Sequence, residues 1–199
     1  MKRILILMLA VVSTSIFAQK TYYNNAVNSC TGSTSAELIE CIKGTYLLDY
    51  DFKTIEGNLI STSKIKKPIV VIAAATWSGP FWGGMPALNE FVEKNHDKIE
   101  FIMIFWDKED KIKRFTGKIN ENIALIPARE SDKVERGNLD ISGFVHKLND
   151  YPTAYLIDKN KKFLDVIRGA ASPSKTMKWD EVTKVNLANL NKAMSPLLQ

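Results

Sequence analysis

Two cysteines near the N-terminal end, Cys30 and Cys41, are the only thiols in the 199-residue chain. A pair of thiols can form a disulfide, bind a metal ion or carry out thiol–disulfide exchange. In an oxidising compartment such a pair is most simply a structural disulfide, so we expect Cys30 and Cys41 to be bonded. Two free buried thiols are the alternative. We expect no metal site, because His96 and His146 are isolated in the sequence.

The segment before the second cysteine carries a signal for the start of a helix. Thr34 followed by Glu37 is the pattern of a capping box, in which each side chain bonds the backbone N–H of the other residue. We therefore expect a short helix over residues 36–41, within a polar leader that spans residues 19–45. A disulfide would attach this helix to the loop before it and, because the closed loop is short, would contribute about 2–3 kcal/mol to stability.

A second place where chemistry could occur is the run Trp77-Ser78-Gly79-Pro80-Phe81. Two elements must position it. The first is the continuous apolar run over 68–75, which is typical of a central strand covered on both faces. The second is a helix predicted over 83–95, where Met85, Leu88, Phe91 and Val92 share one side and Pro86 should introduce a kink.

The remaining elements complete one α/β domain over residues 46–199. An apolar run at 99–106 predicts a second buried strand, so that strand, helix and strand form a βαβ unit. The other elements that we expect are a hairpin of runs 46–52 and 57–61, a short helix at 108–116, a brief strand at 123–126, a loop at 127–141, a short helix around 144–148, an antiparallel hairpin of strands 153–158 and 162–167, and an amphipathic helix at 180–198 whose apolar side holds Val182, Val185, Leu187, Leu190 and Met194. The expected architecture is a central mixed sheet flanked by helices.

The first eighteen residues have the form of a secretory signal. Lys2 and Arg3 precede an apolar run over 4–17, which is shorter than the roughly 18 residues that a membrane span needs. We expect cleavage after Ala18, with an uncleaved anchor as the alternative and no membrane span in the mature chain. The net charge of +5 includes Lys2 and Arg3 and so falls to 5 − 2 = +3 in the mature chain. This mild excess, without a basic stripe interleaved with aromatic residues, does not favour nucleic-acid binding.

Residues 68–91 resemble the thioredoxin superfamily, and most closely its exported TlpA-like thiol–disulfide branch. Those proteins have an apolar strand, then Ala-Thr-Trp-Cys-Gly-Pro-Cys, then a helix with Met-Pro-Ala-Leu. This chain has Ala-Thr-Trp-Ser-Gly-Pro-Phe at 75–81 and Met-Pro-Ala-Leu at 85–88. The segment 151–158 is similar to the family's cis-proline strand, and Gly169 fits its closing glycine. The resemblance covers about residues 50–198 and implies a thioredoxin-like fold without a cofactor.

The departures from the family pattern concern its chemistry. In the family the first cysteine supplies an attacking thiolate at a helix N-terminus and the second cysteine resolves the mixed disulfide. Ser78 and Phe81 occupy those two positions, and Ile72 occupies that of a buried acid. A serine oxygen forms no stable bond to a substrate thiol, and phenylalanine has no nucleophile. We therefore expect no catalytic residue in this degenerate motif.

The resemblance also implies a surface that could still bind. In the family a cis-proline, here Pro152 after Tyr151, lies beside the active turn, and its neighbouring backbone pairs with an extended substrate segment. The candidate peptide-binding residues are Trp77, Ser78, Gly79, Pro80, Phe81, Trp82, Tyr151, Pro152 and Thr153. The alternative is that Trp77 and Phe81 are simply packed and that Pro152 serves folding alone.

Two functions remain open from the sequence. The first is a redox-inactive binding module, exported to a bacterial periplasm or cell envelope or secreted, that recognises an extended or unfolded protein segment. The second is an envelope thiol–disulfide oxidoreductase that uses Cys30 and Cys41. The second is weaker, because ten residues separate these cysteines and they belong to a leader outside the core that the superfamily shares.

Overall fold

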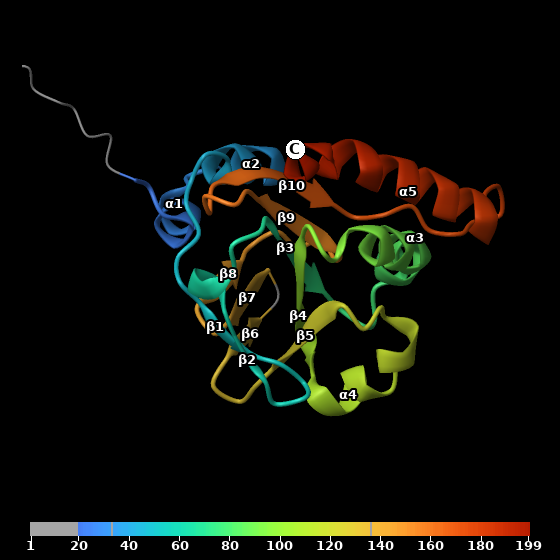
Figure 1. Ribbon diagram of the computed structural model, residues 1–199, viewed down its shortest axis with the longest axis horizontal. Helices are drawn as coiled ribbons and strands as arrows, with labels where there is room; N and C mark the ends of the chain where they lie inside the picture. Colours follow the sequence, from blue (N-terminus) through green and yellow to red (C-terminus); the bar gives the residue numbers. More distant parts are fainter. Residues whose placement is uncertain (1–19, 33, 136) are drawn as a thin grey trace, which may run out of the picture.

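The computed structural model describes residues 20–32, 34–135 and 137–199, so the expected signal segment over 1–18 lies outside the described residues. A five-stranded mixed sheet forms the centre, with strand order β10-β9-β3-β4-β5 (Figure 1). Strands β3 (Ile69–Ala74), β4 (Glu100–Lys108) and β5 (Ile123–Ala128) are parallel. Strand β9 (Thr153–Ile157) runs antiparallel to β3, and β10 (Phe163–Arg168) runs antiparallel to β9. The central strand, the βαβ unit and the later hairpin are confirmed.

Both faces of β3 are covered, and all six of its residues are buried. Val70 and Ile72 point to one side, where they pack against helices α3 (Gly79–Asn95) and α5 (Trp179–Met194). Ile69 and Val71 point to the other side, toward a core that includes helix α1 (Tyr23–Ser29). Side chains alternate between the faces of a strand, so an unbroken apolar run requires a layer on each side.

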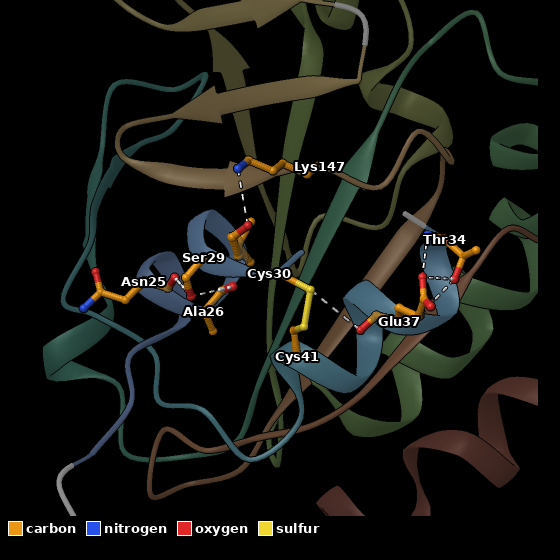
Figure 2. Close-up of a disulfide and its surroundings, with 9 residues drawn as sticks. Asn25, Ala26, Ser29, Cys30, Thr34, Glu37, Cys41 and Lys147 are labelled. Carbon is orange, nitrogen blue, oxygen red and sulfur yellow. Dashed lines mark hydrogen bonds between the residues drawn. A yellow bond between two sulfur atoms is a disulfide. The ribbon is translucent and has the colours of Figure 1, made fainter. Parts of the chain in front are cut away.

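The leader supplies part of the second layer. Tyr23 of α1 is fully buried and stacks between Phe144 and Phe163, with ring centroids 4.9 and 4.6 Å away. The capping box of α2 (Ser35–Ile42) is confirmed: Thr34 Oγ1 accepts from the Glu37 N–H at 3.2 Å, and Glu37 accepts in return from the Thr34 N–H at 2.9 Å. The disulfide between the two cysteines is also confirmed and links the end of α1 to α2 (Figure 2).

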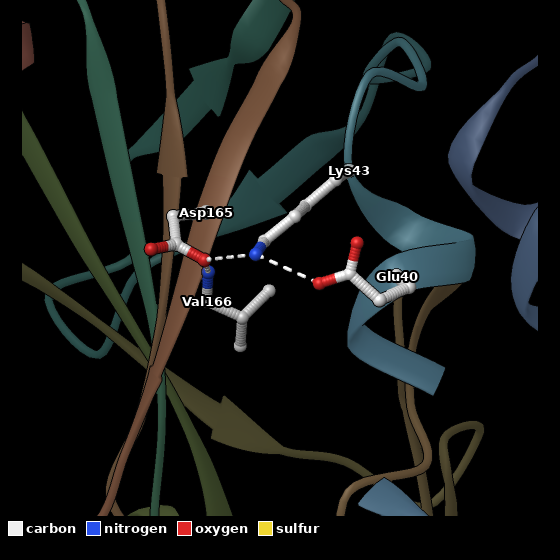
Figure 3. Close-up of polar contacts among 4 residues, drawn as sticks. All are labelled: Glu40, Lys43, Asp165 and Val166. Atoms are coloured by element: carbon white, nitrogen blue, oxygen red, sulfur yellow. Dashed lines mark hydrogen bonds and ion pairs between the residues drawn. The ribbon is translucent and has the colours of Figure 1, made fainter. Parts of the chain in front are cut away.

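The leader also covers the outer edge of β10. The Gly44 N–H donates to the Phe163 carbonyl at 2.8 Å, and the Phe163 N–H donates to the Thr45 carbonyl at 2.9 Å. Further along, Asp165 accepts from the Val166 N–H at 2.9 Å and pairs with Lys43 of the leader at 3.3 Å (Figure 3). An uncovered strand edge invites pairing with other chains, so the leader and Asp165 together protect this one.

The segment over 127–148 was predicted wrongly as a loop and a short helix. It forms a three-stranded antiparallel sheet of β6 (Lys133–Glu135), β7 (Asn138–Ile141) and β8 (Phe144–His146). Leu139 and Ile141 are buried while Asp140 between them is only half-buried, and Gly143 turns the chain into β8 with a φ of +87°. These short strands bury few residues each, so their period-two pattern is weak in the sequence.

Other differences concern boundaries and one helix face. Helix α3 begins at Gly79 rather than at residue 83 and continues through Pro86. In α5 the side chain of Val185 is 40% exposed, whereas Asn186 is buried. The shorter elements are β1 (Asp51–Lys53) and β2 (Leu59–Ser61), which form the expected hairpin, together with α4 (Glu109–Lys113) and the 3₁₀ helices η1 (Thr62–Lys64), η2 (Thr116–Lys118) and η3 (Ser195–Leu198). Within 20–32, 34–135 and 137–199, no helix is long and apolar enough to cross a membrane.

Reduction of the disulfide should destabilise the fold by about 3 kcal/mol, because the bond removes loop-closure entropy from the unfolded chain. Urea unfolding of the oxidised and the dithiothreitol-reduced protein measures this difference. The double variant with Cys30→Ala and Cys41→Ala is the control, and its stability should not respond to reductant. Equal stability of the oxidised and reduced wild type would show that the bond contributes nothing.

Candidate functional site

The turn between β3 and α3 is held by the hydroxyl of Ser78. Ser78 is the N-cap of α3, and its oxygen accepts from the Phe81 N–H at 3.4 Å. The same hydroxyl donates to the backbone carbonyl of Tyr151, and Ser78 is only 5% exposed. Both capabilities of a hydroxyl, to donate and to accept, are thus used within the fold.

The loop before β9 lies directly beside this turn. The bond between Tyr151 and Pro152 is cis, as the resemblance implied. The carbonyl of Tyr151 accepts from Ser78, and the carbonyl of Pro152 accepts from the Gly169 N–H at 2.7 Å. Part of the backbone expected to pair with a substrate is therefore already bonded within the fold, although a carbonyl oxygen has a second lone pair. Thr153, which follows, is fully buried.

Three rings form what we call the aromatic surface: Trp77, Trp106 and Tyr151. Trp77 packs edge-to-face on Trp106 and Tyr151, with centroids 6.3 and 5.5 Å away, and Trp106 lies 5.9 Å from Tyr151. Trp77 is nevertheless 61% exposed. Trp106 was not predicted from the sequence as part of this site. It lies near the carboxyl end of β4, which is parallel to β3, and the carboxyl ends of neighbouring parallel strands meet at one edge of a sheet, so its place in the strand could have indicated it.

The other aromatic residues of the motif are placed differently. Phe81 is 2% exposed and packs on Phe105, with centroids 6.0 Å apart. Trp82 is half-buried, and its indole N–H donates to the Thr76 carbonyl at 2.8 Å. Phe81 and Trp82 thus pack within the fold, whereas Trp77 faces solvent together with Gly79 and Pro80. A role in peptide binding stays a prediction for all the residues proposed from the sequence.

A buried carboxylate beneath the turn was also missed. Asp107 is 2% exposed, and its Oδ2 accepts from the Thr76 N–H at 2.6 Å. Its Oδ1 makes no hydrogen bond within the described residues and lies 3.7 Å from the ammonium of Lys111. Asp107 thereby fixes the residue that precedes Trp77, which makes it a positioning residue for the turn.

A buried histidine lies under the aromatic surface. The ring of His146 is 5.1 Å from that of Tyr151, and its Nδ1 is 2.7 Å from the Tyr155 hydroxyl. Desolvation lowers the pKa of His146 to about 3 and raises the pKa of Tyr151 to about 12. Both groups are therefore neutral near pH 7.

Comparison with known proteins supports the fold. No protein-family model matches the chain, and no curated protein matches it. A candidate thiol:disulfide interchange protein DsbE from Chlorobium tepidum aligns with a TM-score of 0.56 at 19% identity, over 78% of this chain and 97% of that one. A thio-disulfide isomerase from Thermus thermophilus aligns at 0.53 and 15%, over 78% and 96%, and a candidate protein disulfide isomerase from Bacteroides thetaiotaomicron at 0.53 and 18%, over 78% and 89%.

At these identities the similarity shows the fold and not the activity. The chain has an α/β thioredoxin-like fold with a central mixed sheet flanked by helices, as expected from the sequence. Its two cysteines are bonded to each other in the N-terminal leader.

Stability should fall as the pH falls from about 6.5 to about 3, because the unfolded chain binds a proton on His146 in this window and the folded chain does not. Above about pH 6.5 His146 is neutral in both the folded and the unfolded chain, so its titration no longer lowers the free energy of unfolding. Replacement with His146→Gln should flatten this part of the profile, measured as the free energy of unfolding at half-unit steps of pH. The carboxylates contribute equally to the pH profiles of the wild type and of His146→Gln. If the difference in the free energy of unfolding between these two proteins stays constant from about pH 6.5 to about pH 3, the lowered pKa of His146 is contradicted.

Proposed function

We propose that this chain is an exported thioredoxin-like protein of the cell envelope that binds an extended protein segment and carries out no thiol–disulfide exchange at the turn over 77–81. One observation carries the proposal: the hydroxyl of Ser78, the residue that we align with the attacking cysteine of the family, caps α3 and donates to the carbonyl of Tyr151. A hydroxyl in this position stabilises the turn and leaves no sulfur to attack a disulfide.

The rest of the turn supports the loss of chemistry. Phe81 stands in the position of the resolving cysteine and is packed against Phe105. Ile72, in the position of the buried acid, is 2% exposed and belongs to the same apolar cluster as Phe81. A serine, a phenylalanine and an isoleucine in these three positions provide neither half of an exchange reaction nor a proton carrier.

The aromatic surface supports the binding role. Trp77 exposes most of its ring beside Tyr151, and an exposed tryptophan supplies a large contact area at a low entropy cost. The Tyr151 carbonyl, two residues before the start of β9, has a second lone pair that can accept from a backbone N–H of a bound segment, as in strand addition. An extended segment would then lie across Trp77 with its backbone at Tyr151.

Binding should depend on Trp77 and not on exposed tryptophan in general. A reduced and carboxymethylated unfolded protein is a suitable probe, because it is extended and has no thiols to exchange. Replacement with Trp77→Ala should weaken its binding at least tenfold, as measured by fluorescence anisotropy, because the central aromatic contact is lost. Trp179→Ala is the matched control, since Trp179 is 53% exposed at the start of α5, and it should bind as the wild type does. If Trp77→Ala and Trp179→Ala bind the probe with equal affinity, the aromatic surface is not the binding site.

The remaining disulfide should be structural and the turn inactive. We expect no insulin reduction by the wild type and a reduction potential below about −300 mV for Cys30–Cys41. The double replacement Ser78→Cys with Phe81→Cys should produce measurable insulin reduction, because it supplies both sulfur atoms on the same scaffold. Turnover by the wild type that disappears in Cys30→Ser would instead support an oxidoreductase that uses the leader cysteines.

A further inference from the structure

Two short basic segments of the sequence come together in the structure. Each holds three lysines: residues 64–67 lie just before β3, and residues 159–162 form most of the turn between β9 and β10. The Lys161 ammonium donates to the carbonyl of Ile65 at 2.6 Å, so the two segments are in contact. The pKa of Lys161 is lowered, first by burial and then by the positive charge of Lys66, because like charges oppose each other's ionisation.

The start of the leader lies beside the second of these segments. The backbones of Tyr46 and Lys162 form an antiparallel bridge, and the Leu47 N–H donates to the Lys161 carbonyl at 2.8 Å. The ammonium of Lys20 lies 4.8 Å from the centre of the Tyr46 ring. The lysines of the three segments form what we call the basic face, which consists of Lys20, Lys64, Lys66, Lys159, Lys161 and Lys162.

The basic face carries more positive charge than the mature chain as a whole. Within the described residues none of its six lysines forms an ion pair, whereas the neighbouring Lys67 is paired with Glu100 at 3.1 Å. Asp49 and Asp158 are the acidic groups that act on Lys161. Six lysines and these two aspartates give 6 − 2 = +4, while the mature chain carries 5 − 2 = +3, so its other residues sum to 3 − 4 = −1.

The basic face and the aromatic surface lie at opposite ends of the central sheet. Ile69, the first residue of β3, pairs with Ile157, the last residue of β9, and the two basic segments end and begin within two residues of this pair. At the other end Ala73 pairs with Thr153, next to the turn at Trp77. The length of β3 separates the two ends by about 17 Å, at roughly 3.3 Å per residue.

We propose that the basic face docks the protein on a bilayer surface that contains anionic phospholipids. Lipid phosphates supply negative charges that match its ammonium groups, and lysines gathered on one side of a molecule orient it on such a surface. The aromatic surface would then point away from the bilayer. The inference does not depend on the proposed peptide binding.

The place of the basic face in the chain favours a bilayer over a soluble polyanion. The expected signal segment ends at Ala18, two residues before Lys20, so this face would be the part of the fold next to the membrane during export. Tyr22 is 39% exposed, and its backbone pairs with that of Tyr46. Tyrosine and lysine side chains both keep an apolar part in a membrane interface and a polar tip in water, so an exposed tyrosine beside lysines fits a lipid surface.

Binding to vesicles tests the inference. The mature protein should bind vesicles of phosphatidylglycerol and phosphatidylcholine in equal parts at least tenfold more tightly than vesicles of phosphatidylcholine alone, as measured by co-sedimentation. Binding to the anionic vesicles should weaken when the salt concentration rises from about 0.1 M to about 1 M, because the Debye length falls from about 10 Å to about 3 Å. The absence of a preference for the anionic vesicles overturns the inference.

Charge-reversal variants separate the basic face from the net charge. Lys66→Glu with Lys162→Glu should weaken binding to the anionic vesicles at least tenfold, because one lysine at an anionic surface contributes roughly fivefold. Lys175→Glu with Lys184→Glu makes the same change in net charge at two exposed lysines before and on α5, and should bind as the wild type does. Thermal unfolding checks that both variants are folded, and Lys66→Gln with Lys162→Gln provides a milder change. Equal loss of binding in the two reversed variants, or tighter binding to soluble heparin than to the anionic vesicles, overturns the inference.

Fluorescence quenching tests the orientation on the bilayer. In a Trp179→Phe variant, Trp77 is the most exposed tryptophan, because it is 61% exposed and the other two are half-buried. Acrylamide should quench its emission as strongly on anionic vesicles as in solution, and brominated phospholipids should not quench it. Quenching by the brominated lipids would place the aromatic surface on the bilayer and would overturn docking through the basic face.

Discussion

The burial of β3 on both faces is the constraint on which the rest of the molecule depends. Six consecutive apolar residues leave no side of this strand for water, so each face needs its own layer. Helices α3 and α5 form one layer (Figure 1), and the other includes Tyr23 of the leader, which stacks between Phe144 and Phe163. The leader is therefore more than an extension, and its disulfide holds a segment that the core requires.

The same strand arrangement creates the candidate site. Chain direction places the carboxyl ends of β3 and β4 together, which brings the turn at Trp77 next to Trp106 and Asp107. The polar groups there bond one another: Asp107 holds Thr76, and Ser78 holds Tyr151. The hydroxyl of Ser78 is thus used within the fold, and Trp77 is exposed beside it together with Gly79 and Pro80. Beneath it, burial lowers the pKa of His146 to about 3, so this imidazole is neutral near pH 7 and only weakly basic.

The aromatic surface and the groove between α3, α5 and β10 differ in their chemistry. The aromatic surface offers one exposed ring and a backbone acceptor, which suits a segment of polypeptide. The groove between α3, α5 and β10 has mostly apolar walls, with Asp165, Arg168 and Lys192 as charged lining residues. Phe81 connects them, because it is packed beneath the turn and also lines the groove.

The sequence by itself determined the features that depend on local patterns: the apolar strand over 68–75, the capping box at Thr34, the later hairpin, and a disulfide between the only two cysteines. The motif at 75–81 indicated the thioredoxin-like fold. Only the tertiary structure decided how far the helix face of Val185 is exposed, that 133–146 forms strands, and that Trp106 and Asp107 join the turn. These features arise from contacts between residues far apart in the chain, whose energies exceed local preference and leave no periodic signal in a short segment.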